Sequence, residues 1–193
     1  MEIDDPNELE GLPTPKLLGL YGALLDELRR RGVVRSSNNP LSDYAEGLFC
    51  KAFGWDQEGN SAAGYDAVDA ASGTRYQIKG RRLTAHNASR QLSAIRNLDG
   101  RPFHFLAGLL VDARFQIVRA AIIPYEVVKA KAVRVEHTNI WKFLLRDLVR
   151  TLPGVRDVTD ELRQAASASG DDSGCGDLSA QKPASIDRPA QSS

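Results

Sequence analysis

The sequence contains few of the residues that bind zinc or form disulfide bonds. Only two of the 193 residues are cysteines and three are histidines. Cys50 lies in a hydrophobic stretch and Cys175 in a low-complexity tail, and neither has a second Cys or a His at a metal-binding spacing. The sequence therefore argues against a zinc site and a disulfide framework, and we interpret Cys50 as a small buried hydrophobic residue.

Long hydrophobic runs are also missing. The longest run, Phe105 to Val111, is far shorter than the ~20 apolar residues that a membrane-spanning helix needs. The segment MEIDDPNELE at residues 1–10 has neither the basic start nor the apolar core of a secretory signal. We therefore expect a cytoplasmic protein without membrane contact.

An excess of either charge is absent as well. Lys and Arg number 25, and Asp and Glu also number 25, which excludes a histone-like polycation and a uniformly acidic tail protein. The chain has no glycine-rich phosphate loop and no Gly-x-Ser-x-Gly motif, which argues against P-loop nucleotide hydrolysis and serine hydrolase chemistry. Any nucleic-acid-binding surface must therefore be local.

Hydrophobic residues make up 42% of the chain, enough for the core of one domain. They recur at helical spacing after Pro15 and Pro40, alternate between Tyr65 and Arg82, and then form two nearly continuous runs. We predict helices over 15–31, 41–52, 87–98, 124–132 and 141–149, a hairpin of strands 65–71 and 74–81, and strands 103–111 and 115–123.

This order of elements predicts the α/β (α+β) class, with a mixed sheet of about four strands flanked by helices. The strand over 103–111 is almost entirely apolar, so we expect it to be buried on both faces. Residues 1–13 are interpreted as an acidic lead-in and residues 14–163 as the domain. Residues 164–193 are rich in Ala, Ser, Gly, Asp and Pro, so we predict a disordered tail.

The most informative segment is GYDAVDAASGTRYQIKGRR, residues 64–82. Residues two apart in a strand share a face, so Gln77 and Lys79 should point the same way. If the hairpin loop around residues 72–73 has an even number of residues, Asp66 lies opposite Lys79 on that face. An odd loop would move Asp66 to the other face of the sheet.

A carboxylate, an amide oxygen and a lysine on one face suit metal-assisted hydrolysis of phosphodiester bonds. Mg²⁺ or Mn²⁺ prefers oxygen ligands such as the Asp66 carboxylate and the Gln77 amide, and Lys79 can orient or help deprotonate the attacking water. The motif is short, and the alternative interpretation is a surface hairpin whose Asp–Lys pair contributes about 0.2–1 kcal/mol.

Together with an upstream helical acid, this motif resembles that of a known superfamily. Glu46, then Gly-Tyr-Asp ending at Asp66, then Gln-Ile-Lys at 77–79 is similar to the PD-(D/E)xK restriction-endonuclease-like superfamily, in the Mrr-type branch where Gln can replace the first acid. The stretches SSNNPLSDYAEGL, RYQIKGRR and SRQLSAIRNL also resemble an uncharacterised bacterial family with this nuclease-like fold. The resemblance covers residues 15–130.

The resemblance implies a restriction-endonuclease-like sheet flanked by helices and a metal-dependent nuclease that cuts DNA in restriction, repair or defence. It assigns catalysis to Asp66, Gln77, Lys79 and Glu46, and the ligands of Mg²⁺ or Mn²⁺ to Asp66, Gln77, Glu46 and the Ile78 carbonyl. Glu46 has a structural alternative, a capping box in which Asp43 caps the helix. Because Gln77 removes one negative charge, the alternative function is an inactive nuclease-fold module that binds nucleic acid or protein.

Basic residues are concentrated between residues 75 and 101, a segment that contains seven Lys and Arg residues and a single acidic residue, Asp99. Such a cluster attracts phosphate groups if the side chains converge, although a run of charges can also be an ordinary solvated face. We predict DNA as the partner and also consider a homodimer. The predicted DNA contacts are Arg75, Arg81, Arg82, Arg90 and Arg96.

Overall fold

The computed structural model describes residues 9–35, 39–59 and 64–168. The helices are α1 (Thr14–Arg30), α2 (Pro40–Phe53), α3 (Tyr125–Lys131) and α4 (Thr159–Ser167). The strands of the main sheet are β1 (Asp56–Gln57), β2 (Ala67–Asp69), β3 (Thr74–Arg82), β5 (Phe105–Val111), β6 (Ile117–Pro124) and β9 (Arg156–Asp157). A second sheet consists of β4 (Ile95–Arg96), β7 (Val133–Val135) and β8 (Ile140–Lys142), and short 3-10 helices span Leu98–Gly100, Glu136–Thr138 and Asp147–Thr151.

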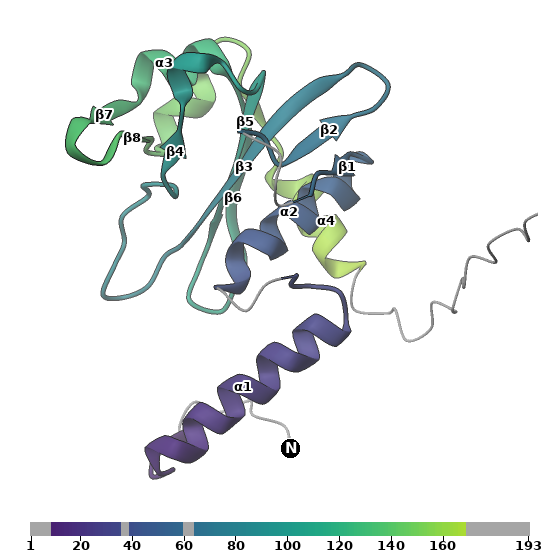
Figure 1. Ribbon diagram of the computed structural model, residues 1–193, viewed down its shortest axis with the longest axis vertical. Helices are drawn as coiled ribbons and strands as arrows, with labels where there is room; N and C mark the ends of the chain where they lie inside the picture. The colour runs from purple at the N-terminus through teal and green to yellow at the C-terminus, as the bar shows by residue number, and fades with distance from the viewer. Residues whose placement is uncertain (1–8, 36–38, 60–63, 169–193) are drawn as a thin grey trace, which may run out of the picture.

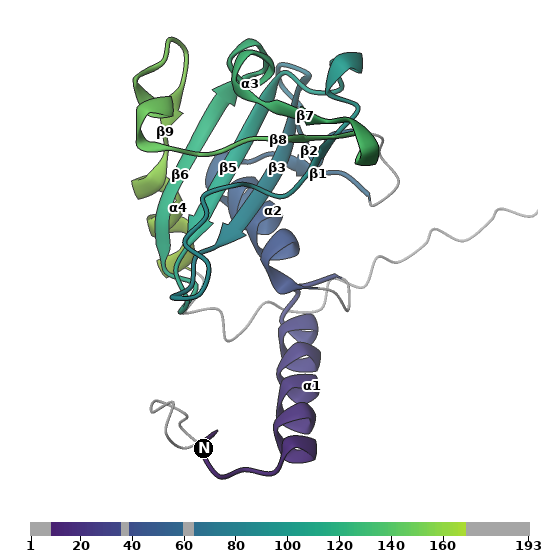
Figure 2. The same cartoon turned by 90° about the vertical axis from the view of Figure 1, so that its left-hand side faces the viewer.

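The main sheet has the strand order β1-β2-β3-β5-β6-β9 and is mixed, because β3 and β5 run parallel while the other neighbours run antiparallel. Helices α2 and α4 lie on one side of this sheet, and α3 and the second sheet lie on the other (Figures 1 and 2). The predicted mixed α+β class is confirmed. The main sheet has six strands rather than about four.

Two hydrophobic clusters hold these layers together, one on each face of the main sheet. The cluster under α2 and α4 includes Phe49, Leu109 and Leu162, and the cluster under the second sheet includes Leu106 and Phe143. Six of the seven residues of β5 are buried, and they contribute to both clusters. The prediction that this strand is buried on both faces is therefore confirmed.

The two N-terminal helices follow the predicted pattern. Helix α2 begins after Asn39, whose side chain accepts a hydrogen bond from the Leu41 N–H at 3.0 Å. It ends at Gly54, which adopts the left-handed conformation with φ 68°. Helix α2 approaches β3 so closely that a Cβ on Gly80 would lie 3.0 Å from Leu41 Cγ. Glycine at this position therefore sets the distance between the helix and the strand.

The predicted helix over 87–98 is wrong. Residues 84–94 form turns and an extended segment stabilised by local polar bonds, which compete with helical hydrogen bonds. The side chain of Asn87 accepts from the Ser89 N–H at 3.2 Å, and Ser89 Oγ accepts from the Gln91 N–H at 3.3 Å. The predicted helix over 141–149 is also wrong, because the chain there forms β8 and then a 3-10 turn.

The C-terminal part of the described chain extends the domain. Helix α4 continues to Ser167 and buries Ala165, so regular structure passes the predicted boundary at residue 163. The remainder of the predicted tail, residues 169–193, and residues 1–8 of the lead-in lie outside the described residues. Among the helices that the structure describes, none is long and apolar enough to cross a membrane.

Candidate active site

The candidate site lies where β2 separates from β3. The ladder between these strands pairs Ala67 with Tyr76, and Asp66 is the residue just before it. The Asp66 Oδ2 atom accepts a hydrogen bond from the Ile78 N–H at 2.7 Å. The Asp66 carboxylate therefore binds a β3 backbone group that lies beyond the end of the β2–β3 ladder.

Asp66, Gln77 and Lys79 share one face of the hairpin, as predicted. The side-chain amide of Gln77 donates to Asp66 Oδ2, and Lys79 Nζ lies 3.3 Å from the same oxygen. The loop has four residues, 70–73, which is the even number that this arrangement requires. The predicted register is wrong by two residues, because the observed ladder places Asp66 opposite Gln77 and diagonal to Lys79.

The shift in register has a local cause at the hairpin turn. The Asp69 carboxylate accepts hydrogen bonds from the Ala71 N–H and from Ser72 Oγ, each at 2.9 Å. The Asp69 carbonyl accepts from the Gly73 N–H at 2.8 Å, and Gly73 has a φ of 68°. These bonds widen the predicted two-residue loop to four residues while preserving its parity.

The Ile78 carbonyl was predicted to be a metal ligand. In a strand, the N–H and C=O of one residue point to the same edge. Because the Ile78 N–H reaches Asp66, its carbonyl faces the edge at which Asp66 lies. The Ile78 side chain belongs to the cluster under α2, so only its backbone lies at the candidate site.

Glu46 lies at this site but not in the predicted capping box. Helix α2 begins at Pro40, so Asp43 is inside its first turn and does not cap it. The Glu46 Oε2 atom accepts hydrogen bonds from the Arg35 guanidinium and, at 3.1 Å, from Gln57 Nε2. Its side chain is 14% exposed. The carboxylate is therefore held by side-chain partners rather than by the helix backbone.

The electrostatics connect Glu46 to Asp66 and Lys79. Burial raises the pKa of the Glu46 carboxyl above its ordinary value, and the negative charge of Asp66 raises it further. The hydrogen bond from Gln57 and the charges of Arg35 and Lys79 act in the opposite direction. Glu46 is therefore within electrostatic range of both Asp66 and Lys79, although its hydrogen-bond partners are Arg35 and Gln57.

Sequence reasoning missed Arg35 and Gln57. Arg35 precedes α2 and is fixed by its backbone N–H, which donates to Asp43 Oδ2 at 2.9 Å. Its guanidinium donates to the Glu58 carbonyl at 3.2 Å as well as to Glu46. Both residues come from irregular segments or very short strands, where hydrophobic periodicity carries no signal.

The predicted DNA-contacting arginines do not lie on one face. Arg75 and Arg81 flank Gln77 and Lys79 on the same face of β3, whereas Arg82 points to the other face. Arg82 donates to the Ala113 carbonyl and lies 4.9 Å from the centre of the Phe115 ring. Two predicted contacts lie beyond this hairpin: Arg90 pairs with Asp147 at 2.8 Å, and Arg96 is exposed on β4.

Arg81 differs from the other arginines in one respect. Its Nε atom is buried and has no hydrogen-bond partner among the described residues. Arg75 stacks on Tyr65, with its guanidinium carbon 5.6 Å from the ring centre. Only Arg75 and Arg81 of the five predicted arginines therefore align with the candidate catalytic residues.

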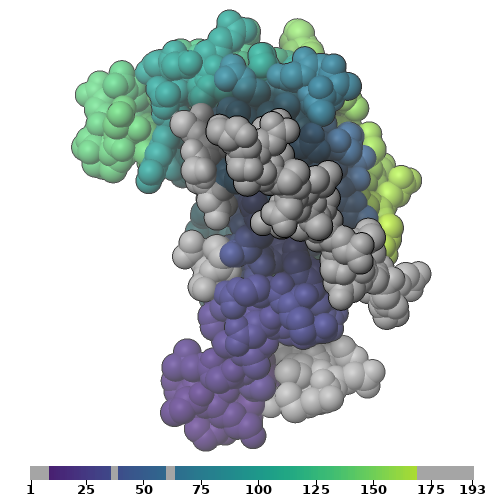
Figure 3. Space-filling view, turned by 45° about the vertical axis from the view of Figure 1, so that its right-hand side comes forward, coloured from purple at the N-terminus to yellow at the C-terminus, as the bar shows by residue number. Residues whose placement is uncertain are grey.

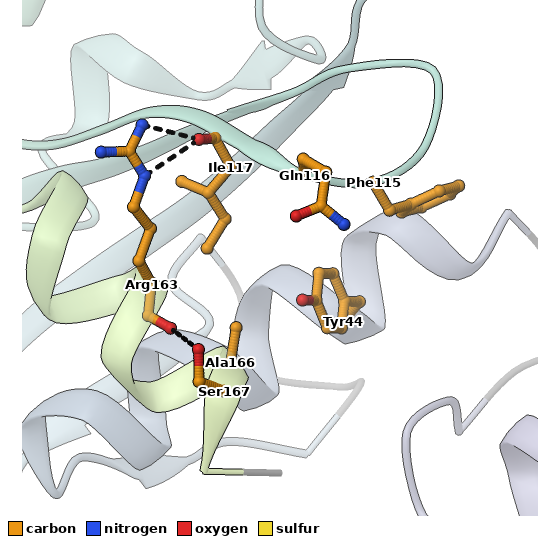
Figure 4. Close-up of a pocket in the computed structure, with 7 residues that line it drawn as sticks. All are labelled: Tyr44, Phe115, Gln116, Ile117, Arg163, Ala166 and Ser167. Carbon is orange, nitrogen blue, oxygen red and sulfur yellow. Dashed lines mark hydrogen bonds between the residues drawn. The ribbon is translucent and has the colours of Figure 1, made fainter. Parts of the chain in front are cut away.

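A groove of about 630 Å³ lies elsewhere, between α2, the turn before β6, and α4 (Figure 4). The Arg163 guanidinium is held there by two hydrogen bonds to the Ile117 carbonyl, at 3.1 and 3.3 Å. Tyr44 and Phe115 line the same groove, and none of the predicted catalytic residues does. The groove is therefore separate from the candidate site.

Comparison with known proteins adds no relative. Neither a protein-family model nor a curated protein sequence matches the chain. The candidate site contains two carboxylates, one amide, one backbone carbonyl and a lysine, which are groups that can bind a hard cation and an anionic substrate.

Proposed function

We propose that this site hydrolyses phosphodiester bonds in DNA with the help of Mg²⁺ or Mn²⁺. The observation that carries the proposal is the convergence of Gln77, the Ile78 N–H and Lys79 on Asp66 Oδ2. This is the arrangement implied by the resemblance to the PD-(D/E)xK superfamily. A DNA-cleaving role also accords with the cytoplasmic location proposed from the sequence.

The donor set fits a hard divalent cation. Asp66 and Glu46 would hold it through carboxylate oxygens, with the Ile78 carbonyl and the Gln77 amide oxygen as neutral ligands. Gln77 now donates its amide N–H to Asp66, so its amide must rotate to present oxygen to a cation. A bound cation supplies charge neutralisation at the phosphate and favours ionisation of water.

The other residues act on the substrate. Hydrolysis forms a bond from the water oxygen to phosphorus and breaks the bond to the leaving oxygen, which takes up a proton. Lys79 lies beside Asp66 with its side chain 19% exposed, so its ammonium group can orient the water and attract the phosphate. Arg75 and Arg81 extend the positive charge along β3 on either side of this point.

A second candidate function is a nuclease-fold module that binds DNA without cutting it. The observation that favours it is that Gln77 is neutral and donates its amide N–H to Asp66. An acidic residue at this position would instead provide a second charged ligand for the cation. Both candidate functions use the basic face of β3, which carries Arg75, Lys79 and Arg81. They differ only in metal-dependent cleavage.

Nicking of supercoiled plasmid DNA with Mn²⁺ or Mg²⁺ tests the proposal. We expect wild-type protein to nick DNA. Asp66→Asn and Lys79→Ala should each lower the rate on the order of 100-fold or more, because the first removes a charged ligand of the cation and the second removes the ammonium group that attracts the phosphate. Asp160→Asn and Lys131→Ala are matched controls on exposed helix surfaces. DNA binding by the wild type without cleavage would establish the non-cutting module instead.

Binding measured against salt concentration tests the basic face separately. Arg75→Ala and Arg81→Ala should each weaken DNA binding and reduce the salt slope by about 1. Arg82→Ala should change binding little, because its guanidinium is bound to the Ala113 carbonyl on the other face of β3. Equal effects of Arg81→Ala and Arg82→Ala would contradict this assignment.

A further inference from the structure

Helix α1 carries a hydrophobic face that the domain leaves exposed. The helix extends away from the two sheets and joins the domain only through its C-terminal end (Figures 1 to 3). It buries none of its residues, and Leu18, Tyr21 and Leu24 are 65%, 54% and 59% exposed. Exposed large apolar side chains grouped on one helix face are typical of a protein interaction site.

The spacing of the main apolar residues of α1 is the same in both directions along the helix, because Leu17, Tyr21, Leu24 and Leu28 are separated by four, three and four residues. At 100° per residue, they form one broad face, and Lys16, Ala23 and Arg30 lie on the opposite face. Two antiparallel copies centred between Gly22 and Ala23 place Leu17 opposite Leu28, and Tyr21 opposite Leu24. The residues flanking this seam are Leu18, Leu20 and Leu25.

The charges of the sequence that flanks α1 on its two sides favour an antiparallel orientation. The sequence before Lys16 contains five acidic residues and no basic one, namely Glu2, Asp4, Asp5, Glu8 and Glu10. The other end carries Arg29, Arg30 and Arg31, whose acidic neighbours are Asp26 and Glu27. Antiparallel pairing brings acidic and basic ends together, whereas parallel pairing stacks like charges.

We propose that α1 forms an antiparallel pair with α1 of a second copy of this chain, which makes the protein a homodimer. The helix of 17 residues is about 25 Å long at 1.5 Å per residue. The seam contains Leu17, Tyr21, Leu24 and Leu28 of each helix, which makes eight side chains. If each loses about 60–120 Å² of solvent-accessible surface, the seam buries roughly 500–1,000 Å² before the flanking leucines are counted. That area approaches the ~1,000 Å² of a specific interface, so the dimer should dissociate on dilution.

The dimer has a defined geometry. Each α1 ends a few residues before Arg35, which binds Glu46 in the domain of the same chain. An antiparallel pair therefore holds the two domains at opposite ends of the joined helices. The inference rests on α1 alone and does not depend on the proposed nuclease activity.

Sedimentation velocity of the full chain tests the dimer. Over a range from about 1 to 200 μM, the wild-type mass should rise from 21.1 kDa toward twice that value. Leu24→Glu should raise the dissociation constant at least about 10-fold, because it places a charge in the seam. The matched control Ala23→Glu adds the same charge on the opposite face and should leave the dissociation constant within about twofold. A wild-type monomer at every concentration, or equal effects of the two variants, would overturn the proposal.

Disulfide trapping tests the orientation. In a background with Cys50→Ala and Cys175→Ser, one chain carries Leu17→Cys and the other carries Leu28→Cys. The mixture should form crosslinked dimers upon mild oxidation, while each variant alone should crosslink at least about 10-fold less, because disulfide formation requires Cα atoms within about 7 Å. Crosslinking by a single variant as efficient as by the mixture would show parallel pairing and refute the antiparallel arrangement. Circular dichroism of each variant verifies that the domain is folded.

Discussion

Replacing Gln77 with Glu probes the feature that separates the two candidate functions. In the wild type, the Gln77 amide donates to Asp66 Oδ2. A glutamate there cannot donate when ionised, and it places a second carboxylate directly against Asp66, with Glu46 also in electrostatic range. We therefore expect the variant to be less stable without a cation and to bind a divalent cation more tightly.

The size of the effect follows from the separation of the charges. Two like charges about 4 Å apart repel by about 4 kcal/mol at an effective dielectric constant of about 20. The Asp66 side chain is 21% exposed, so solvent and side-chain movement relieve part of this repulsion. A loss of about 2 kcal/mol in the free energy of unfolding lowers the melting temperature of a domain of about 150 residues by about 4–8 °C.

Thermal unfolding in EDTA and then in Mn²⁺ measures both parts of the prediction. In EDTA, Gln77→Glu should have a lower melting temperature than the wild type. Mn²⁺ should raise the melting temperature of the variant more than that of the wild type, because the cation neutralises the added repulsion. Gln164→Glu is the matched control, since Gln164 is exposed on α4. Equal melting temperatures of Gln77→Glu and wild type in EDTA, together with equal responses to Mn²⁺, would refute the proposed cation site.

Two further predictions test the packing around the site. Gly80→Ala should lower the free energy of unfolding by about 1–2 kcal/mol, because its Cβ would lie 3.0 Å from Leu41 Cγ. The control Gly47→Ala, on the exposed surface of α2, should stabilise the protein by up to about 1 kcal/mol. Chemical denaturation measures both variants, and equal effects would contradict the close approach of α2 to β3. Burial raises the pKa of the Cys50 thiol to about 11. In a Cys175→Ser chain at pH 8, Cys50 should therefore react with iodoacetamide on the order of 100-fold more slowly in the folded protein than in the unfolded protein. Similar rates in the two states would show that the thiol is accessible and ionised.

The shared face of the hairpin could be predicted because strand periodicity depends only on parity. Gln77 and Lys79 are two residues apart in one strand, and any even loop brings Asp66 to the same side. The register could not be predicted, because it depends on how the Asp69 side chain organises the turn. Local hydrogen bonding therefore determined which residue faces Asp66, while the alternation of the strand determined the face.

The two wrong helices show where apolar spacing is ambiguous. Leu92, Ile95 and Leu98 are three residues apart and fully buried. The polar side chains of Asn87 and Ser89, just before them, bind the backbone in place of helical hydrogen bonds. In the other segment, Phe143 and Leu145 are buried while Leu148 is 76% exposed, which is strand alternation followed by a surface turn. Hydrophobic spacing alone could not separate these cases from a helix.

The charge balance of the candidate site depends on tertiary contacts that no local pattern contains. Two carboxylates, Asp66 and Glu46, are paired with two internal cations, Lys79 and Arg35. A divalent cation must therefore compete with groups that already neutralise its ligands. Gln77→Glu adds a negative charge without adding an internal cation, so it should alter cation affinity more than the loss of one hydrogen bond would.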